Sequence, residues 1–372
     1  MKYFIITILL LILLTPVASS EPIAPGWYGD TLIQYLRINY KTSTTLGYDK
    51  ARDTLYGVID RHNDSLTCIY CLFSMYPMPP LPTDPSTWAY NGGSVDGINC
   101  EHTFPQSMGA DIEPARSDMH HLYPCKNNVN SSRGNNPYNE IDDGFTSTWY
   151  RHNYSSNSIP TEFIWEYAEK LNGTNACFEP RDSAKGKIAR GIFYFYTMYK
   201  ENTVGSDDPL FFDKQKNVLM QWSQLYLPDS QEEARTWKIA SYQDNNPNPF
   251  VIDPTLVIRA YFPEQSGFIK EISQESNDSK MFSLSQNYPN PFINVTNIKY
   301  MLAKPANINI SIISIDGREM RTIVNEYKKT GRYEIYWDGR DNNGKRVKQG
   351  IYFSVLSVEN KTVKMNKIIL LK

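Results

Sequence analysis

Three of the chain's five histidines lie close together, at positions 102, 120 and 121, and the residues around them restrict the fold of this stretch. The run from Ile98 to His102 is strand-like, and Pro105 soon after it favours an end or a bend in that strand. A second strand-like run extends from Ser117 to Tyr123, and the chain is expected to enter a helix or a helix-like turn from Lys126 onward. The sequence therefore predicts a β-hairpin, with strands at residues 95–102 and 117–123, followed directly by a helix.

This predicted hairpin and helix carry a distinctive set of polar side chains, which includes Glu101, His102, Asn130 and two arginines, Arg116 and Arg133. Carboxylate and amide oxygens bind hard divalent cations, and an imidazole with a pKa near neutrality can take a proton from water. A guanidinium group can bind a phosphate through two hydrogen bonds. Together these side chains can hold one cation, deprotonate a water molecule and neutralise a phosphodiester.

Several of these positions leave structural alternatives open. Neighbouring strand residues point to opposite faces, so Glu101 and His102 can approach a common centre only if the strand ends or bends there. For the same reason, at most one of His120 and His121 can face a cation, and each is predicted to serve the architecture. Arg133 either clamps a phosphate or braces the hairpin against the helix, and the sequence does not decide between these roles.

The first twenty residues predict a secretory signal peptide. Lys2 precedes an apolar run from Phe4 to Leu14, and small residues follow near Ala18 and Ser20, where cleavage is expected. The run is too short to span a bilayer, although a single transmembrane anchor is the alternative. An exported chain can form disulfides, and a bridge between Cys100 and Cys125 would brace the hairpin.

The remaining length predicts two domains of different character, an α+β fold followed by an all-β one. The first, at residues 21–262, is expected to be mainly helical, and a polar linker should occupy residues 263–280. The second, at residues 281–372, is predicted to be an immunoglobulin-like β-sandwich, because short β-rich runs alternate with Gly, Asn and Asp turns. The expected helices lie at residues 45–62, 161–171, 184–200 and 231–241, and the expected strands at 298–301, 308–313, 333–337, 351–358 and 362–371.

Charge is distributed unevenly between these two parts. Lys280 to Lys372 contains 16 basic and 7 acidic residues, whereas the preceding part contains 22 and 33. The part with the histidine cluster is therefore acidic, which argues against strong non-specific affinity for nucleic acid. Any binding of phosphate there has to come from a local cluster of side chains.

Three motifs in the histidine-bearing part together resemble the extracellular and periplasmic endonuclease I family, which has a ββα-metal site. They are Cys100-Glu101-His102-Thr103-Phe104-Pro105-Gln106-Ser107, Asp118-Met119-His120-His121-Leu122-Tyr123-Pro124 and Val129-Asn130-x-x-Arg133-x-Asn135, within a similarity that covers roughly residues 45–255. The resemblance implies that Glu101 and Asn130 bind one divalent cation, Mg²⁺ or alternatively Mn²⁺ or Ca²⁺. It also implies that His102 is the general base. Arg133 would act at the catalytic centre, and Arg116 and Arg133 would contact the substrate.

The C-terminal part resembles a different group of proteins. The opening Asn287-Tyr288-Pro289-Asn290-Pro291-Phe292 and the later Trp337-Asp338-Gly339 are similar to the sorting domain of type IX secretion substrates. This resemblance implies export by the type IX machinery to the medium or cell surface of a Gram-negative bacterium. A generic immunoglobulin-like binding module is the alternative.

Two functional hypotheses follow from these features. The first is a secreted, monomeric, metal-dependent endonuclease that acts on DNA, RNA or both. The second is a surface-associated, non-catalytic protein that binds polyanions through a nuclease-like domain. The presence of Glu101, His102 and Asn130 favours the first hypothesis, and the acidic balance of the same domain favours the second.

Overall fold

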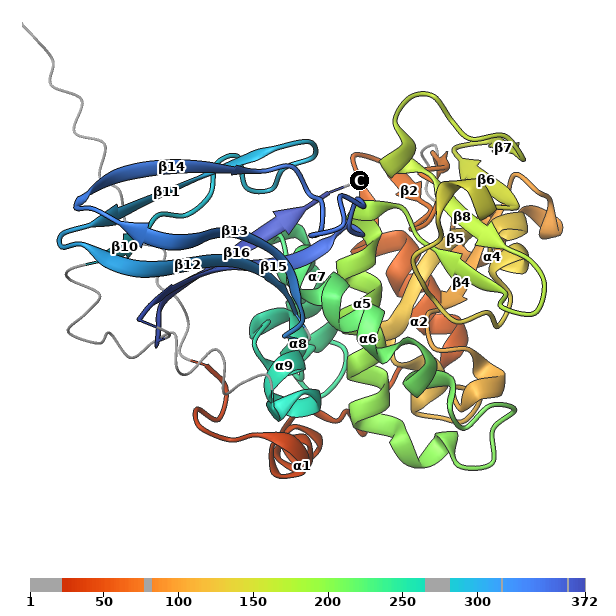
Figure 1. Cartoon of the computed structure of the whole chain (residues 1–372). Helices are drawn as coiled ribbons and strands as arrows, with labels where there is room; N and C mark the ends of the chain where they lie inside the picture. The colour runs from red at the N-terminus through yellow and green to blue at the C-terminus, as the bar shows by residue number, and fades with distance from the viewer. Residues whose placement is uncertain (1–21, 77–81, 265–281, 316, 360, 372) are drawn as a thin grey trace, which may run out of the picture.

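The computed structural model describes residues 22–76, 82–264, 282–315, 317–359 and 361–371, so the predicted signal peptide and almost all of the predicted linker lie outside the described residues. The described part has the predicted α+β fold: helices and small sheets come first, and an all-β region follows (Figure 1). None of its helices is long and apolar enough to cross a membrane.

The longest helix, α5 (Asp182–Tyr199), runs through the middle of the helical region (Figure 1). Its apolar side chains recur every three or four residues, and Ile188, Ile192 and Phe195 are completely buried. Helix α6 (Phe211–Leu225) packs beside α5. The predictions of helices at 184–200 and 231–241 are confirmed by α5 and by α7 (Ser230–Ala240). The shorter helices around this core are α1 (Gly29–Tyr40), α3 (Pro85–Tyr90), α8 (Pro249–Ile252) and α9 (Leu256–Tyr261).

The predicted hairpin and helix are present. Strand β4 (Ile98–His102) pairs antiparallel with β5 (Leu122–Lys126), so that Glu101 lies opposite Tyr123, and α4 (Asn127–Arg133) follows at once. The prediction of a return strand at 117–123 is wrong, because residues 119–121 form a 3-10 turn. The Asp118 side chain accepts a hydrogen bond from the backbone N–H of His120, which favours a turn over an extended strand.

Two other expected helices differ from the structure. Residues 45–62 form α2 (Tyr48–Thr54) and a π-helical turn (Leu55–Ile59), which ends in β1 (Arg61–His62) of the small sheet β1-β2-β3. The other strands of that sheet are β2 (Ser65–Thr67) and β3 (Ser74–Met75).

The prediction of a helix at 161–171 is wrong. Strand β8 (Ala168–Leu171) pairs there with β6 (Thr148–Arg151) and β9 (Cys177–Glu179), and β7 (Tyr154–Ser156) completes the sheet. Two aromatic side chains of this stretch are about half exposed, Phe163 at 45% and Trp165 at 51%, so they do not form the buried stripe of a helix.

Two antiparallel sheets form the C-terminal region. One has the order β10-β11-β14 and the other β13-β12-β15-β16, and Trp337 is buried in their shared core. Their bounds are β10 (Phe282–Leu284), β11 (Thr296–Leu302), β12 (Ala306–Ser314), β13 (Glu319–Lys328), β14 (Gly331–Trp337), β15 (Gly350–Val358) and β16 (Lys361–Leu370).

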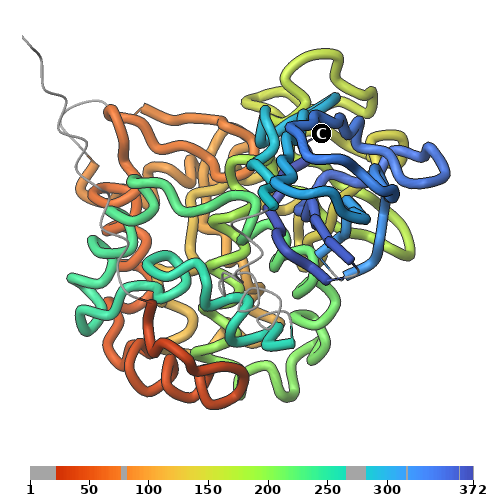
Figure 2. Tube along the Cα trace, turned by 60° about the vertical axis from the view of Figure 1, so that its left-hand side comes forward, coloured from red at the N-terminus to blue at the C-terminus, as the bar shows by residue number. Residues whose placement is uncertain are grey.

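All five predicted C-terminal strands are present, whereas β10 and β13 were not predicted. Strand β13 lies at a sheet edge and is rich in polar and charged residues, as edge strands often are, so it lacks a strong apolar signal. Figures 1 and 2 show this region to one side of the helices, where Lys367 Nζ donates to the Gln224 carbonyl of α6 at 3.1 Å.

Candidate active site

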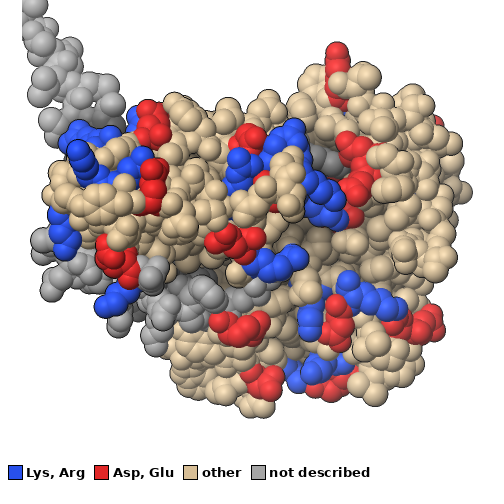
Figure 3. Space-filling model, viewed as in Figure 1, with Lys and Arg blue, Asp and Glu red and all other residues tan. Residues whose placement is uncertain are grey.

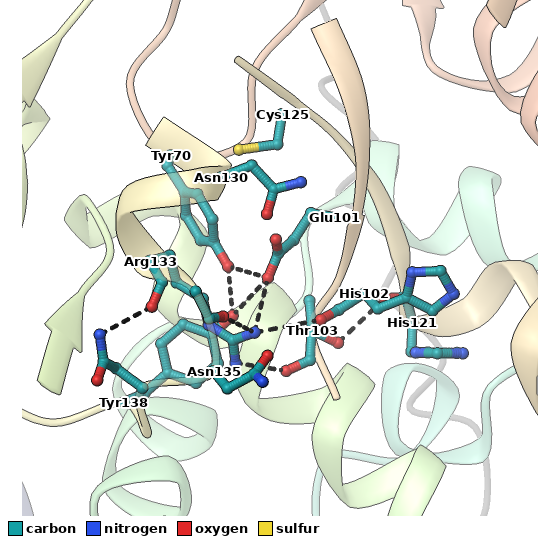
Figure 4. Close-up of polar contacts among 12 residues, drawn as sticks. Tyr70, Glu101, His102, Thr103, His121, Cys125, Asn130, Arg133, Asn135 and Tyr138 are labelled. Atoms are coloured by element: carbon teal, nitrogen blue, oxygen red, sulfur yellow. Dashed lines mark hydrogen bonds and ion pairs between the residues drawn. The ribbon is translucent and has the colours of Figure 1, made fainter. Parts of the chain in front are cut away.

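Glu101 lies at the end of β4 and is 1% exposed. Its Oε1 accepts a hydrogen bond from the Tyr70 hydroxyl at 2.7 Å, and it lies 3.4 Å from the Tyr138 hydroxyl and 3.2 Å from Nη1 of Arg133 (Figure 4). Burial raises the pKa of the Glu101 carboxyl, and the Arg133 charge and the tyrosine hydrogen bonds act in the opposite direction. None of the described residues donates a hydrogen bond to the other oxygen, Oε2.

Asn130, on α4, lies beside the same carboxylate. Its Nδ2 donates to the Asn99 side-chain oxygen at 2.7 Å and to the Cys100 carbonyl at 3.3 Å, and these bonds fix the orientation of the amide. Within the described part of the chain its Oδ1 receives no hydrogen bond, and Figure 4 shows this oxygen on the side of Glu101. An amide oxygen and a carboxylate oxygen with unused lone pairs therefore lie near each other.

A second buried carboxylate, Asp118, accepts hydrogen bonds at both of its oxygens and provides a comparison for Glu101. Its Oδ2 accepts from the hydroxyls of Tyr194 and Tyr199, at 2.8 and 2.7 Å, and its Oδ1 accepts from Gln243 Nε2 at 2.9 Å. Both oxygens of Asp118 are thus occupied by protein donors. Glu101 differs because only Oε1 is occupied, which leaves Oε2 available to a ligand.

This donor set fits a hard cation that keeps most of its water molecules. Among the described residues, no group of three or more His, Cys, Asp or Glu side chains is placed to hold a metal ion. Magnesium does not need such a cage, because it commonly binds through one or two protein oxygens and retains several waters. One carboxylate oxygen and one amide oxygen are sufficient for that mode of binding.

His102 is the last residue of β4 and is 6% exposed. Its Nε2 lies 3.0 Å from the Arg116 carbonyl, which can only accept, so Nε2 carries the proton. Nδ1 then has the lone pair, and Gln106 Nε2 approaches it as a donor at 3.5 Å. The Arg116 carbonyl therefore fixes the tautomer of the His102 ring. Burial, the nearby His121 and the Arg116 and Arg133 charges lower the pKa of His102 to about 3, so the ring is neutral at neutral pH.

The direction of the two strand-end side chains matters for any substrate. Figure 4 shows His102 on one side of the backbone, near His121, and Glu101 and Asn130 on the other. Neighbouring residues of a strand point to opposite faces, so Glu101 and His102 must diverge in this way. Strand β4 ends at His102, which agrees with the end or bend expected from Pro105.

The two candidate arginines have different surroundings. Arg133 is 1% exposed; besides Glu101, its Nη1 reaches the His102 carbonyl at 3.4 Å and its Nη2 donates to the Thr103 carbonyl at 2.9 Å. These contacts are those of a brace between helix and hairpin. Arg116 is only partly buried, and its guanidinium lies 4.6 Å from the centre of the Tyr48 ring, which is itself 5.4 Å from the His102 ring. Arg116 therefore lies nearer the surface beside His102.

The other two clustered histidines are buried in the core. His120 Nε2 donates to the Asn246 carbonyl at 2.9 Å, and His121 Nε2 donates to the Ala115 carbonyl at 2.8 Å. Burial lowers the pKa of both rings, that of His121 to about 4. Both histidines thus have the architectural role that the sequence predicted.

Acid should destabilise the fold through these two buried rings. In the unfolded chain a histidine has a pKa of about 6.5, so between that pH and the lower folded pKa the unfolded state binds more protons. Stability is then complete above pH 6.5 and falls as the pH decreases, by about 2 kcal/mol for His121 at pH 5. Urea unfolding at pH 7.5, 6 and 5 measures this loss, and His121→Gln should make the decrease shallower. An unchanged pH dependence in that variant would contradict the assignment.

The predicted disulfide between Cys100 and Cys125 is absent from the described residues. All five cysteines are buried and free, so the described residues form no disulfide. Cys125 Sγ lies 3.8 Å from Cys68 Sγ, which lies 3.4 Å from Cys71 Sγ. Cys100 instead packs in a different apolar cluster with Tyr56. The predicted Cys100–Cys125 bridge is wrong because Cys100 pairs with Pro124 in the hairpin, and the side chain of Cys125 faces the other cluster.

Tyr70 and Tyr138 are contacts of the site that sequence reasoning missed. They lie 31 and 37 residues from Glu101 along the chain, in a turn and in a loop. The chain has 26 tyrosines, and no motif or spacing distinguished these two.

Comparison with known proteins agrees with this geometry. A family model for Endonuclease I matches residues 30–255, and a model for the FlgD Ig-like domain matches residues 294–361. The extracellular ribonuclease of Bacillus subtilis (strain 168) is 31% identical over 177 residues, which cover 44% of this chain and 54% of that protein. The extracellular ribonuclease of Bacillus amyloliquefaciens is 31% identical over 176 residues, with the same coverage. Endonuclease-1 of Buchnera aphidicola subsp. Baizongia pistaciae (strain Bp) is 26% identical over 153 residues, which cover 41% of this chain and 51% of its own.

The chain spans about half the length of these curated relatives. Among solved structures, dimeric latent PorU from Porphyromonas gingivalis matches 24% of this chain and 9% of its own at 17% identity, with a TM-score of 0.22 that is too low to indicate a shared fold. The Endonuclease I match, in contrast, covers more than half of the chain and includes the hairpin, the following helix and the residues Glu101, His102 and Asn130. The chain therefore belongs to the endonuclease I family.

Proposed function

We propose that this protein is a secreted, metal-dependent endonuclease that hydrolyses phosphodiester bonds in DNA, RNA or both. One observation carries the proposal: the free oxygens of Glu101 and Asn130 lie together at the end of the strand that also carries the neutral His102. The names of the relatives, two extracellular ribonucleases and an endonuclease, support a nuclease activity.

In this proposal Glu101 Oε2 and Asn130 Oδ1 hold one divalent cation, which we expect to be Mg²⁺. When bound, the cation supplies stabilisation of the negative charge on the phosphate and on the leaving 3′ oxygen. Glu101 and Asn130 fix its place. The substrate phosphodiester lies across the end of β4, because Glu101 and His102 leave the strand on different sides.

His102 acts as the general base in the proposed reaction. Its Nδ1 lone pair accepts a proton from the attacking water, while the Arg116 carbonyl keeps the other proton on Nε2. The phosphate's negative charge raises the pKa of the ring in the complex, opposing the effect of burial. Arg116 borders the phosphate, and Arg133 holds Glu101 and the end of β4 in place.

Recognition of the substrate backbone is expected to be local. Two basic residues of α5, Lys185 and Arg190, are buried and paired with Glu179 and Glu232, at 2.8 and 2.5 Å, so they do not extend a basic groove. On the face shown in Figure 3, Lys and Arg side chains lie in small groups beside Asp and Glu. In this proposal the protein therefore binds the substrate backbone through a few phosphate contacts near Arg116.

Incubation of the purified chain with supercoiled plasmid and with a structured RNA tests the proposal. Nicked and linear plasmid, shortened RNA or both are expected in the presence of Mg²⁺. Retention of either nucleic acid in a gel-shift assay without any cleavage would instead favour the polyanion-binding alternative.

We also propose that residues 281–372 direct export through the type IX machinery and take no part in catalysis. The proposed catalytic side chains all lie before residue 134, and the C-terminal region packs on α6, away from the hairpin (Figure 1). Deletion of 281–372 should leave turnover per molecule unchanged and, in the native host, retain the protein in the periplasm. Assays of medium, envelope and periplasm measure both effects. Export of the truncated protein would contradict the sorting role, and loss of its turnover would place this region in the substrate groove.

A further inference from the structure

We propose that Tyr70 is a positioning residue for the metal site: by holding Oε1 of Glu101, it leaves Oε2 turned toward Asn130 and ready for a cation. This inference rests on the proposed function, because it concerns the same cation. It adds a residue from outside the hairpin and helix, and it assigns that residue a measurable effect on metal affinity.

The two oxygens of Glu101 have unequal surroundings. Oε1 is approached by the Tyr70 hydroxyl, the Tyr138 hydroxyl and the Arg133 guanidinium, at 2.7, 3.4 and 3.2 Å. No described donor approaches Oε2. The carboxylate is therefore held by one oxygen only, and its rotation is restricted without use of the oxygen that faces Asn130.

The two tyrosine hydroxyls and Glu101 form a chain of hydrogen bonds. The two hydroxyls are hydrogen-bonded to each other, and each hydroxyl has only one proton to donate. The Tyr70 bond to Glu101 is short and the Tyr138 contact is long, so Tyr138 donates to Tyr70, which in turn donates to Glu101. Tyr70 is then the direct donor, and Tyr138 strengthens its bond. Removal of the Tyr70 hydroxyl should have the larger effect.

The backbone around Tyr70 makes it a rigid support. Tyr70 lies in the turn between Cys68 and Cys71 and is fully buried, with its ring centre 4.8 Å from that of Phe178. The flanking residues are fixed by backbone bonds, from Cys68 N to the Phe73 carbonyl at 2.8 Å and from Ile69 N to the Pro124 carbonyl at 2.9 Å. The second of these bonds ties the turn to β5, the partner strand of β4.

Loss of this hydroxyl leaves Arg133 as the main partner of Oε1. Without the neutral donor the carboxylate can rotate toward the guanidinium, and Oε2 then moves away from Asn130. Comparable changes in residues that orient metal ligands reduce metal affinity by about 10- to 100-fold. A weaker metal site with a preserved maximal rate is the expected signature, because Tyr70 does not contact the reacting groups.

The test compares the Tyr70→Phe, Tyr138→Phe and Tyr194→Phe variants of the full chain after removal of metal with EDTA. Tyr194 is the matched control, because its buried hydroxyl also donates to a buried carboxylate, Asp118, at 2.8 Å. Calorimetric titration with Mg²⁺ and Mn²⁺ gives the affinity without any turnover, and cleavage rates over a Mg²⁺ series separate metal dependence from maximal rate.

We expect Tyr70→Phe to weaken metal affinity about 10- to 100-fold and to recover most of its maximal rate at high Mg²⁺. Tyr138→Phe should lie between Tyr70→Phe and the unaltered chain, and it provides the test if Tyr70→Phe does not fold. Tyr194→Phe should bind metal like the unaltered chain. If the unaltered chain binds metal and both site variants bind it equally well, the positioning role is overturned and the proposed function stands. If the unaltered chain binds no divalent cation, the proposed function fails as well.

Discussion

Replacement of His102 by alanine should lower the cleavage rate by about 10²- to 10⁴-fold, because the attacking water then loses its general base. Metal affinity should change little, since the proposed ligand atoms belong to Glu101 and Asn130. The side chain is 6% exposed, so its removal also costs some stability, and a melting curve has to accompany the kinetic measurement. Initial rates on supercoiled plasmid at saturating Mg²⁺ measure the effect.

The matched control for this experiment is His62→Ala. His62 is exposed and lies in β1, outside the hairpin, so its loss should leave the rate unchanged. Wild-type turnover in His102→Ala would show that another group deprotonates the water. A loss of metal binding in the same variant would show that His102 acts at the metal and not as the base.

Replacement of Arg133 by methionine should destabilise the fold by about 3–5 kcal/mol, the usual cost of removing one partner from a buried ion pair. The guanidinium is 3.2 Å from Glu101 Oε1, and both side chains are almost completely buried. Its donors to the His102 and Thr103 carbonyls would also be lost. Urea unfolding followed by tryptophan fluorescence gives the change in free energy.

Two comparisons decide between the alternatives that the sequence left open for Arg133. Arg116→Met, at a partly exposed site, should cost much less stability and should raise the KM for nucleic acid instead. The double variant with Glu101→Gln should recover part of the loss, because no buried carboxylate then lacks its partner. If Arg133→Met kept its stability and only raised KM, Arg133 would be a phosphate clamp and not a brace.

The parts of the site that could be predicted from sequence are those held by local chain geometry. Glu101 and His102 are adjacent, β5 leads directly into α4, and Asn130 lies within the first turns of that helix. Spacing alone therefore fixes which of these side chains can meet. Helix α5 could also be predicted from the spacing of its apolar residues, although most of its side chains are buried and not those of a single stripe alone.

The parts that could not be predicted depend on contacts between distant segments or on side-chain competition with the backbone. Tyr70 reaches Glu101 only because the turn after β2 packs on β5, and nothing in the local sequence marks that contact. Asp118 converts an expected strand into a turn through a side-chain bond to His120 N. In residues 161–171, pairing of β8 with β6 and β9 overrides an apolar spacing that resembles a helix.

The most direct test of the proposed metal site is the Mg²⁺ dependence of cleavage by the unaltered chain, Glu101→Gln and Asn130→Ala. We expect EDTA to abolish cleavage of plasmid and RNA by the unaltered chain and added Mg²⁺ to restore it. Both variants should need much more Mg²⁺ and should be partly rescued at high concentrations. Full-rate cleavage by the unaltered chain in EDTA, or variants with an unchanged Mg²⁺ dependence, would show that Glu101 and Asn130 do not hold a catalytic cation.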